Sequence, residues 1–438
     1  MTDIAPSPAQ PWPLWQRVLF RFFSIYLLLQ IAPWNWLFAI PGVGKILGPF
    51  NQLFDWGVQF TNTHFLHIAN PLVQPNGSGD TSWAWTEMAM FLGLAIIGTL
   101  LWSILDNKRP DYRRSAYWFR TIVRYYIAAA ALSYGLIKIF ALQMTFPTLS
   151  QLATPLGDLL PMRLSWLFIG YSTPYQMFSG VMETVAGLLL LSRRATTLGL
   201  IAALGAFMNV WMINLAYDVP VKIYAGHLLL ACIVLLAMDA PRLISLLALN
   251  KPASGTTLYE PPYADERFRY ARIALKLFML YAILWTPLNR TWQRAQAARK
   301  IPIAVPLAAG MYDVRLFVRN RDTIPALNSD SLRWRDIIID NNGQGSVGTT
   351  DSLFWQRYHR GYFRYKADTA KRTMALWRTS TRGDSAGIFS ARYELPDSNS
   401  ARLWTKVGND SLFVELVRTP RHFQLTERQF HWISEYNR

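Results

Sequence analysis

The chain has 438 residues, of which 52% are hydrophobic and 16% charged, and its formal net charge at neutral pH is +17. It is too long for one small domain and too apolar for an ordinary soluble enzyme. A mean hydropathy of only +0.12 indicates that a sizeable polar part dilutes the apolar segments. The positive charge fits anionic lipid headgroups better than nucleic acid, because lysine and arginine are not confined to one soluble patch. We therefore expect membrane lipid as a partner, and no nucleic acid.

The sequence predicts a polytopic α-helical membrane protein with about seven spans. Each segment of the central run is long enough to cross about 30 Å of hydrocarbon. A Pro-broken stretch, 145–174, is expected to be interfacial or re-entrant, and the amphipathic part 45–60 to lie in the interface. The predicted spans cover residues 14–40, 83–105, 121–144, 179–191, 196–217, 219–238 and 270–288.

Four domains follow from this segmentation. Residues 1–118 form an N-terminal membrane region with two spans, and 119–250 form a central four-helix membrane bundle. Residues 251–299 are a linker with the seventh span, and 300–438 an extramembrane β-rich domain.

The distribution of basic residues predicts the topology. The second, fourth and sixth connections carry several lysines and arginines each, whereas the first, third and fifth carry one each, and basic loops stay inside. We therefore expect a bacterial inner-membrane protein with a cytoplasmic N-terminus and a periplasmic C-terminal domain. The basic residues of the three inner connections are Lys108, Arg109, Arg113, Arg114, Arg120; Arg193, Arg194; and Arg242, Lys251, Arg267, Arg269.

Polar residues inside the predicted spans mark the candidate site, because they cost free energy in lipid unless they face a partner or a cavity. With the topology above, all fall in the outer half of the membrane. Several share a helical face with small residues, which mark close helix approach, so we expect one polar pocket open to the outside. Lys138 and Glu183 are the expected charge pair within it. The predicted pocket residues are Tyr134, Lys138, Glu183, Asn209, Asn214, Asp218, Lys222 and His227.

Each of these residues also has a structural interpretation. Glu183 with Lys138 can be an ion pair that holds helices together, and the asparagines can do the same by hydrogen bonding. Asp218 is expected to cap the helix that starts near Pro220, and Lys222 to extend to the interface. His227 is either a hydrogen-bonded core residue or a proton carrier.

Three further sequence features give weaker indications of a functional site. The tract Gly77-Ser78-Gly79-Asp80 is a turn or a substrate loop, and alone it is a weak phosphate signal. His64 and His67 share a helical spacing, but no third ligand is spaced to complete a metal site, so no metal is predicted. Cys232 stands alone, which excludes a disulfide framework and a thiol redox pair. No cofactor is evident, although a quinone could bind.

The last part of the chain alternates with period two, which predicts an antiparallel β meander forming a small barrel or sandwich. Turn sequences such as Asn341-Asn342-Gly343 separate the runs. The predicted strands cover 312–320, 332–340, 363–368, 371–380, 387–395, 401–407 and 411–419.

The central pattern resembles the DoxX-like family of bacterial membrane proteins and, more distantly, the four-helix membrane core of the vitamin K-dependent carboxylase superfamily. The residues that carry the resemblance lie between Arg120 and Leu246 and include Tyr134-Gly135, Lys138, Gly180, Glu183, Ser192-Arg193-Arg194, Leu198-Gly199, Asn214, Asp218, Lys222 and His227. The strand-rich end resembles extensions of DoxX-like proteins from Bacteroidota. The resemblance implies a four-helix fold and a link to thiosulfate and quinone redox chemistry.

Two functions are compatible with these features. The first is a binding protein, in which the polar pocket holds a lipophilic ligand and residues 300–438 contact an envelope protein partner. The second is a membrane enzyme acting on a quinone, isoprenoid or lipid, with Glu183, Lys138 and His227 as the candidate catalytic residues. We favour the first, because the β domain carries no catalytic constellation of its own.

Overall fold

The computed structural model describes residues 11–39, 42–253, 266–299, 306–327, 333–341, 343–351, 357–379, 385–428 and 430–435. Ile40 and Asn342, which belong to a predicted span and a predicted turn, lie outside these ranges. The chain forms two compact units. A helical unit comprises residues up to Met144 together with Ser172–Gln293, and a barrel unit comprises Thr145–Tyr171 and residues from Arg294 onward.

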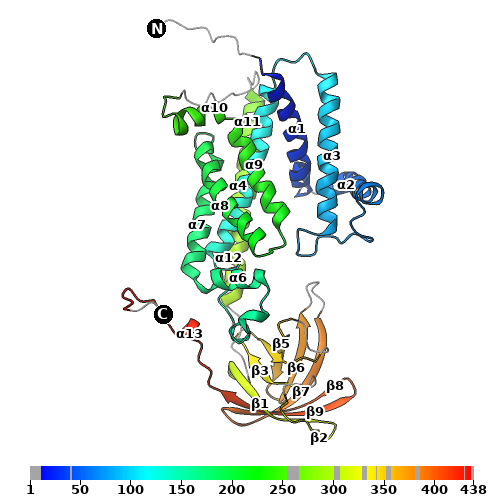
Figure 1. The fold of residues 1–438 in the computed structure, drawn as a ribbon, viewed down its shortest axis with the longest axis vertical. Helices are drawn as coiled ribbons and strands as arrows, with labels where there is room; N and C mark the ends of the chain where they lie inside the picture. The colour runs from blue at the N-terminus through cyan, green and yellow to red at the C-terminus, as the bar shows by residue number, and fades with distance from the viewer. Residues whose placement is uncertain are drawn as a thin grey trace. The chain divides into compact units, whose positions relative to one another are not determined.

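The helical unit contains a series of long helices (Figure 1). In chain order its elements are α1 (Leu14–Ile31), η1 (Pro33–Ala39), α2 (Val43–Thr61), η2 (Asn62–Leu66), α3 (Ser82–Leu105), α4 (Arg113–Ile139), α7 (Thr173–Leu191), α8 (Thr196–Ala216), α9 (Lys222–Ala237), α10 (Ala240–Leu243), η4 (Ile244–Ala248), α11 (Glu266–Leu280), η5 (Tyr281–Trp285) and α12 (Thr286–Arg299).

Within the described residues, five helices are long and apolar enough to cross a membrane. They are Leu14–Trp36, Ser82–Leu105, Arg113–Ile139, Thr196–Ala216 and Arg269–Arg299. A sixth candidate is α9 together with Ala240–Ala248, a pair bent by 76°. The predicted fourth span corresponds to α7, a 19-residue helix that is not among these candidates. The crossing of all seven segments therefore stays a prediction.

Helices α4, α7, α8 and α9 form the predicted four-helix arrangement, since α4 packs on α7 and α9, and α8 packs on the same two helices. The packing of α4 on α7 depends on glycine. A Cβ atom at Gly135 would lie 2.7 Å from the Gly180 carbonyl oxygen, and one at Gly180 would lie 2.6 Å from the Gly135 carbonyl oxygen. The two backbones thus touch at this crossing, an approach that small residues permit.

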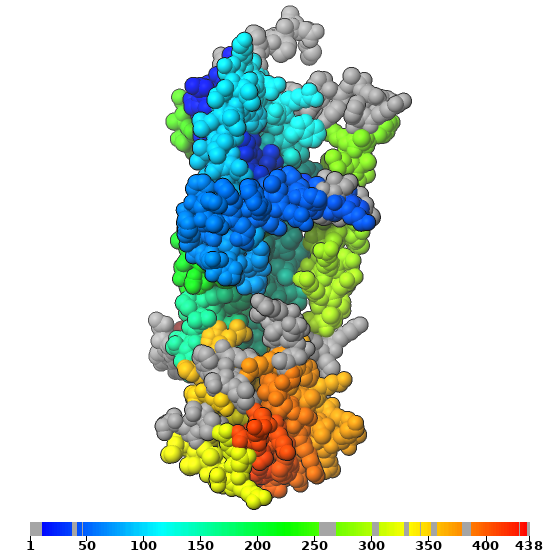
Figure 2. Space-filling view, turned by 90° about the vertical axis from the view of Figure 1, so that its right-hand side faces the viewer, coloured from blue at the N-terminus to red at the C-terminus, as the bar shows by residue number. Residues whose placement is uncertain are grey.

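Helix α2 corresponds to the predicted amphipathic segment and is exposed on one side. Its exposed residues include Leu53, Trp56 and Phe60. Figure 2 shows α2, in blue, as part of a band on the surface of the helical unit. An exposed apolar and aromatic helix face is what an interfacial helix needs.

The barrel unit confirms the predicted antiparallel meander and closes it into a barrel. Strands β1 (Gly310–Arg319), β3 (Asp336–Ile339), β4 (Gln344–Gly348), β5 (Arg360–Asp368), β6 (Thr373–Thr379), β7 (Ser385–Asp397), β8 (Ser400–Val407) and β9 (Asp410–Thr419) pair in this order, and β9 pairs back with β1. The short β2 (Asp322–Thr323) pairs with β1. Closure leaves the eight long strands without a free edge.

Alternate residues of each strand fill the barrel. On β8, for example, Ala401, Leu403 and Val407 are buried while Trp404 and Lys406 face outward. The period of two that predicted these strands is therefore the period of the core.

The segment 145–171, predicted to be interfacial or re-entrant, packs in the barrel unit. It forms α5 (Leu149–Leu152), η3 (Leu156–Asp158) and α6 (Pro161–Tyr171). The Ser150 hydroxyl donates to the Asp340 carboxylate at 2.7 Å, and the Ser150 amide donates to its other oxygen at 3.2 Å. These buried hydrogen bonds anchor α5 to the end of β3. Helix α13 (Gln424–Glu427) follows the last strand.

Candidate functional site

The first group of predicted site residues is the pair Lys138 and Glu183. Lys138, on α4, donates a short hydrogen bond to Glu183 Oε1, on α7, beside the Gly135–Gly180 crossing. The side chain of Glu183 is 3% exposed and that of Lys138 is 8% exposed. The expected charge pair is confirmed. Glu183 Oε2 and the neighbouring Thr184 hydroxyl are buried and have no hydrogen-bond partner among the described residues.

The second group lies at the start of α9. Lys222 makes ion pairs with Asp218 at 2.7 Å and with Asp80 at 3.7 Å. Asp80 also accepts hydrogen bonds from the Lys222 and Ile223 amides at 2.8 and 3.0 Å. Nearby, the Asn214 side-chain amide donates to the Val221 carbonyl at 3.3 Å.

These contacts correct the prediction that Asp218 caps α9. The side chain of Asp218 is 83% exposed, and its backbone has a positive φ of 49° in the turn before the helix. The cap comes instead from Asp80, whose carboxylate satisfies two amides of the first turn. The tract Gly77-Ser78-Gly79-Asp80 is therefore a docked turn, and the Gly79 amide donates to the Pro220 carbonyl at 2.7 Å.

His227 forms a third group with Tyr26 of α1. His227 Nδ1 lies 2.7 Å from the Ile223 carbonyl oxygen, which can only accept, so Nδ1 carries the proton. In the neutral ring Nε2 then accepts from the Tyr26 hydroxyl, also at 2.7 Å. Both ring nitrogens are thus used inside the helical unit.

Asn209 and Tyr134 are exposed, as Asp218 is. The expectation that Asn209 points into the bundle is wrong. Ala202 and Gly205 are the small residues that share a helical face with Asn209, and they predict a close helix approach there, but nothing lies within 4 Å of a Cβ atom built at Gly205. The small residue on that face of α8 is not at a helix crossing.

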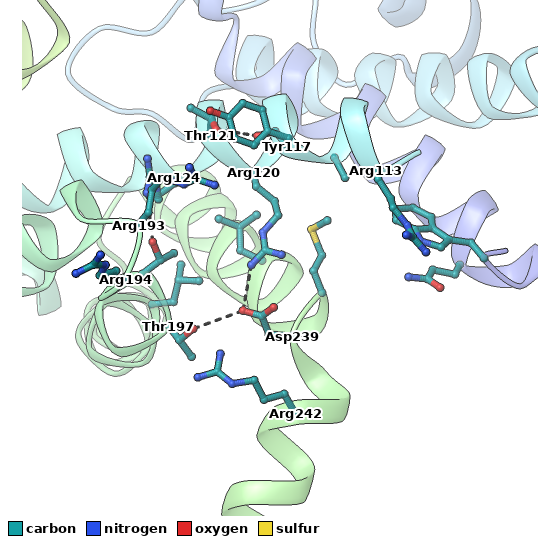
Figure 3. A pocket seen from close by; sticks show the side chains of 17 residues that line it. Arg113, Tyr117, Arg120, Thr121, Arg124, Arg193, Arg194, Thr197, Asp239 and Arg242 are labelled. Carbon is teal, nitrogen blue, oxygen red and sulfur yellow. Dashed lines mark hydrogen bonds and ion pairs between the residues drawn. The ribbon is translucent and has the colours of Figure 1, made fainter. Parts of the chain in front are cut away.

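A pocket lined by arginines, here called the arginine pocket, lies elsewhere in the helical unit (Figure 3). Its volume is about 960 Å³. Six arginines and one acidic residue, Asp239, line it, so its formal net charge is +5. They come from α4, the α7–α8 connection, the end of α9 and α10. The arginines are Arg113, Arg120, Arg124, Arg193, Arg194 and Arg242.

Asp239 accepts hydrogen bonds from two residues that line the arginine pocket. Arg120 Nη2 donates to Asp239 Oδ2 at 3.0 Å, and the Thr197 hydroxyl lies 3.4 Å from the same oxygen (Figure 3). This one carboxylate therefore links α4, the start of α8 and the end of α9.

Arg124 lies deeper, with 8% of its surface exposed. Its Nη1 is 3.3 Å from the Thr196 hydroxyl, while its Nε is buried without a hydrogen-bond partner among the described residues. An unpaired donor on a buried cation is costly, so an acceptor at this position would stabilise it.

The start of α8 adds to the positive field of the arginine pocket. Thr196, Thr197 and Leu200 from its first turns line the pocket, and the helix has no side-chain cap at Ala195. The amides of an uncapped first turn and the helix dipole both favour an anion. Leu200, Leu235 and Met238 supply an apolar wall.

The sequence contained a signal for this pocket that the prediction missed. The third span was predicted to start near 121, which left Arg113 and Arg120 in a loop. Helix α4 begins at Arg113, and Arg113, Arg120 and Arg124, spaced by seven and four residues, lie on one helix face. Arg193 and Arg194 were interpreted as topology determinants only.

No metal site is found among the described residues, since they hold no group of three or more His, Cys, Asp or Glu side chains placed to bind one. His64, one of the two histidines weighed earlier, is exposed and its Nδ1 contacts the Phe60 carbonyl at 3.0 Å.

Comparisons with known proteins assign no function. No protein-family model matches the chain, and no solved structure matches it. Over 76 residues it is 36% identical to the uncharacterized protein YwoB of Bacillus subtilis (strain 168), a stretch covering 17% of this chain and 49% of YwoB. The chain thus spans about half the length of this relative. The resemblance to the DoxX-like family stays a prediction.

Proposed function

We propose that this chain is a membrane protein that binds an anionic amphiphile, with the ligand's charged headgroup in the arginine pocket. The observation that carries the proposal is the net charge of +5 around a cavity of about 960 Å³. Positive charges gathered around a cavity favour an anionic ligand there, and the buried Arg124 Nε, which has no hydrogen-bond partner among the described residues, favours an acceptor group.

The apolar wall supports an amphiphile over a purely ionic ligand. Leu200 and Leu235 are buried beside the arginines, and the surrounding helices are apolar enough to cross a membrane. A headgroup among the arginines would leave its hydrocarbon chain next to these side chains. By the positive-inside rule, we place this end of the helical unit at the cytoplasmic leaflet.

This proposal keeps the predicted binding of a lipophilic ligand but moves the ligand's polar part to the arginine pocket. Lys138, Glu183 and His227 bond to other groups of the helical unit, which favours a structural role for them. The periplasmic placement of the barrel unit and its contact with an envelope partner remain part of the proposal.

Native mass spectrometry tests the proposal. We would extract the full chain gently from its own membranes and identify the lipids that it retains. Arg194→Gln removes an exposed pocket arginine, and Arg114→Gln removes an exposed arginine that does not line the pocket. We expect the wild type and Arg114→Gln to retain the same anionic lipid, and Arg194→Gln to lose most of it. Equal retention by all three proteins would overturn the proposal.

The catalytic alternative has its own test. If Glu183 is a catalytic residue, Glu183→Gln should assemble normally and leave a substrate unconverted in the membrane lipid extract. If Glu183 is structural, the same variant should lose stability or abundance.

A further inference from the structure

We infer that the arginine pocket selects a headgroup bearing a doubly charged phosphate, meaning a lipid phosphomonoester or diphosphate, over the phosphodiester of an ordinary phospholipid. This inference rests on the proposed function and narrows the class of ligand.

The charge of the arginine pocket is the first argument. A phosphodiester carries one negative charge, whereas a phosphomonoester carries about −1.5 to −2 at neutral pH and offers three terminal oxygens. A pocket with a net charge of +5 is matched more closely by the second class. Electrostatic interactions are stronger in a partly buried cavity than in water, so the difference in binding free energy between the two headgroup classes is larger there.

The positions of the donors are the second argument. Arg120, Arg124 and Arg193 approach the cavity from α4 and from the α7–α8 connection, and the uncapped start of α8 faces it as well. Donors that converge from several elements can bond several terminal oxygens at once. A diester uses two of its four oxygens in ester bonds and leaves two for these donors.

Two groups in the pocket, the Asp239 carboxylate and Arg124 Nε, indicate where the phosphate would bind. Asp239 already places a carboxylate against Arg120 and Thr197, so this position accepts an anion. Arg124 Nε is buried and lacks a partner, so a second acceptor is missing. A phosphate in the pocket would supply an oxygen to Arg124 and compete with Asp239 for Arg120 and Thr197.

The size of the cavity is consistent with this class. Ligand pockets usually measure about 300–1,000 Å³. At about 960 Å³ the arginine pocket has room for one or two phosphates together with the first carbon atoms of a chain.

The test compares two lipids that differ in headgroup and share the same chains. We would titrate the full chain in neutral detergent with dioctanoyl phosphatidic acid, a monoester, and dioctanoyl phosphatidylglycerol, a diester. Inorganic diphosphate serves as a soluble probe of the same charge chemistry. We expect phosphatidic acid to bind at least about tenfold more tightly than phosphatidylglycerol, and more tightly than inorganic diphosphate.

Three variants locate the selectivity. Arg124→Lys keeps the charge but removes Nε, and we expect it to reduce the preference for phosphatidic acid severalfold. Arg194 is exposed, so Arg194→Gln should leave folding intact. The variant should weaken the binding of phosphatidic acid more than that of phosphatidylglycerol. Asp239→Asn removes the competing carboxylate and should increase the affinity for both lipids. Arg114→Gln is the matched control and should change neither.

The outcomes separate the inference from the proposed function. Equal affinity for both lipids, weakened by Arg194→Gln, would overturn the headgroup class and leave the proposed function standing. If no pocket variant changed the affinity for either lipid, both the inferred headgroup class and the proposed function would be overturned. Inorganic diphosphate binding as tightly as phosphatidic acid would support the phosphate chemistry but show that the ligand is not a lipid.

Discussion

Two buried arginines of the helical unit, Arg21 and Arg124, meet opposite surroundings. Arg21 is 1% exposed, and its guanidinium donates to the Tyr112 hydroxyl, the Ser103 hydroxyl and the Asp106 carbonyl at 2.7 to 3.0 Å. The central carbon of its guanidinium also lies over the Tyr112 ring, 5.2 Å from the ring centroid. Arg124 has a similar ring contact with Tyr125, at 5.1 Å, but only one weak hydrogen bond, to Thr196, and its Nε has no partner among the described residues.

Hydrogen-bond partners distinguish structural charges from ligand-binding charges in this unit. A buried charge whose donors are all matched within the protein holds elements together, as Arg21 joins α1 to α3 and to the connection before α4. A buried donor beside a cavity that has no partner within the protein, as Arg124 Nε has none among the described residues, is expected to be matched by a ligand. The pair Lys138 and Glu183 holds α4 against α7, while Glu183 Oε2 has no hydrogen-bond partner among the described residues. The arginine pocket differs from this pair because its unpartnered donor, Arg124 Nε, belongs to a residue that lines a cavity.

The largest effect should come from breaking the matched pair on α4 and α7. Lys138→Met leaves the Glu183 carboxylate buried without its cation, which costs about 3 kcal/mol of unfolding free energy. Equilibrium unfolding of the full chain in mixed micelles measures this. The double variant Lys138→Met with Glu183→Leu should recover most of the loss. A single variant as stable as the wild type would contradict a structural pair.

Arg21→Met should have the next largest effect. It removes hydrogen bonds from a charged donor to Tyr112 and Ser103, so we expect a loss of about 2 kcal/mol. The same unfolding measurement applies, and Arg194→Gln in the arginine pocket is the contrast, expected within about 0.5 kcal/mol of the wild type. If both arginine variants lost the same stability, the distinction between matched and surplus arginines would fail.

Asp80→Ala should have a smaller and more local effect. The variant removes the cap of α9, which costs about 1 kcal/mol. Hydrogen exchange should accelerate at the Lys222 and Ile223 amides and stay unchanged at the end of α9. Asp218→Ala is the control, because its exposed carboxylate caps no amide, and it should leave both amides protected.

The smallest effect concerns pH and the barrel unit. Burial raises the pKa of Asp340, and this outweighs the hydrogen bonds from Ser150 and the nearby charge of Arg360, which lower it. A carboxyl group with a raised pKa in the folded state stabilises the fold at pH values below its unfolded pKa of about 3.9, and that contribution is lost as pH rises through the folded pKa.

The wild type should therefore lose barrel stability as pH rises above about 4, and Asp340→Asn should flatten this pH dependence. Hydrogen exchange of the barrel amides in the full chain, recorded at a series of pH values, measures this pH dependence. Asp410→Asn is the control with the opposite sign. Hydrogen bonds from Arg319 and Asn320 lower the pKa of Asp410, so its contribution is lost only as pH falls below about 3.8. A wild type and an Asp340→Asn variant with parallel profiles would contradict the assignment.

The sequence predicted those parts of the fold that depend on local periodicity. The alternation in 401–407 and 411–419 identified β8 and β9, and the opposite charges of Lys138 and Glu183 inside predicted spans identified their pairing. It missed β4, because Gly345 and Gly348 give the segment low strand propensity.

Contacts between distant segments escaped prediction. Asp80 caps a helix 142 residues further along the chain, and Ser150 bonds to Asp340 across 190 residues. Nothing in the local pattern of either segment marks its partner. The arginine pocket is an intermediate case, since the positive-inside rule places its residues at one side of the membrane but says nothing about a shared cavity.

The most direct test of the arginine pocket is a structure of the full chain determined by cryo-electron microscopy in nanodiscs containing phosphatidic acid. We expect headgroup density within hydrogen-bonding distance of Arg120, Arg124 and Arg193, with Asp239 no longer bonded to Arg120. Density for water alone in the pocket, with the contact between Arg120 and Asp239 intact, would contradict it.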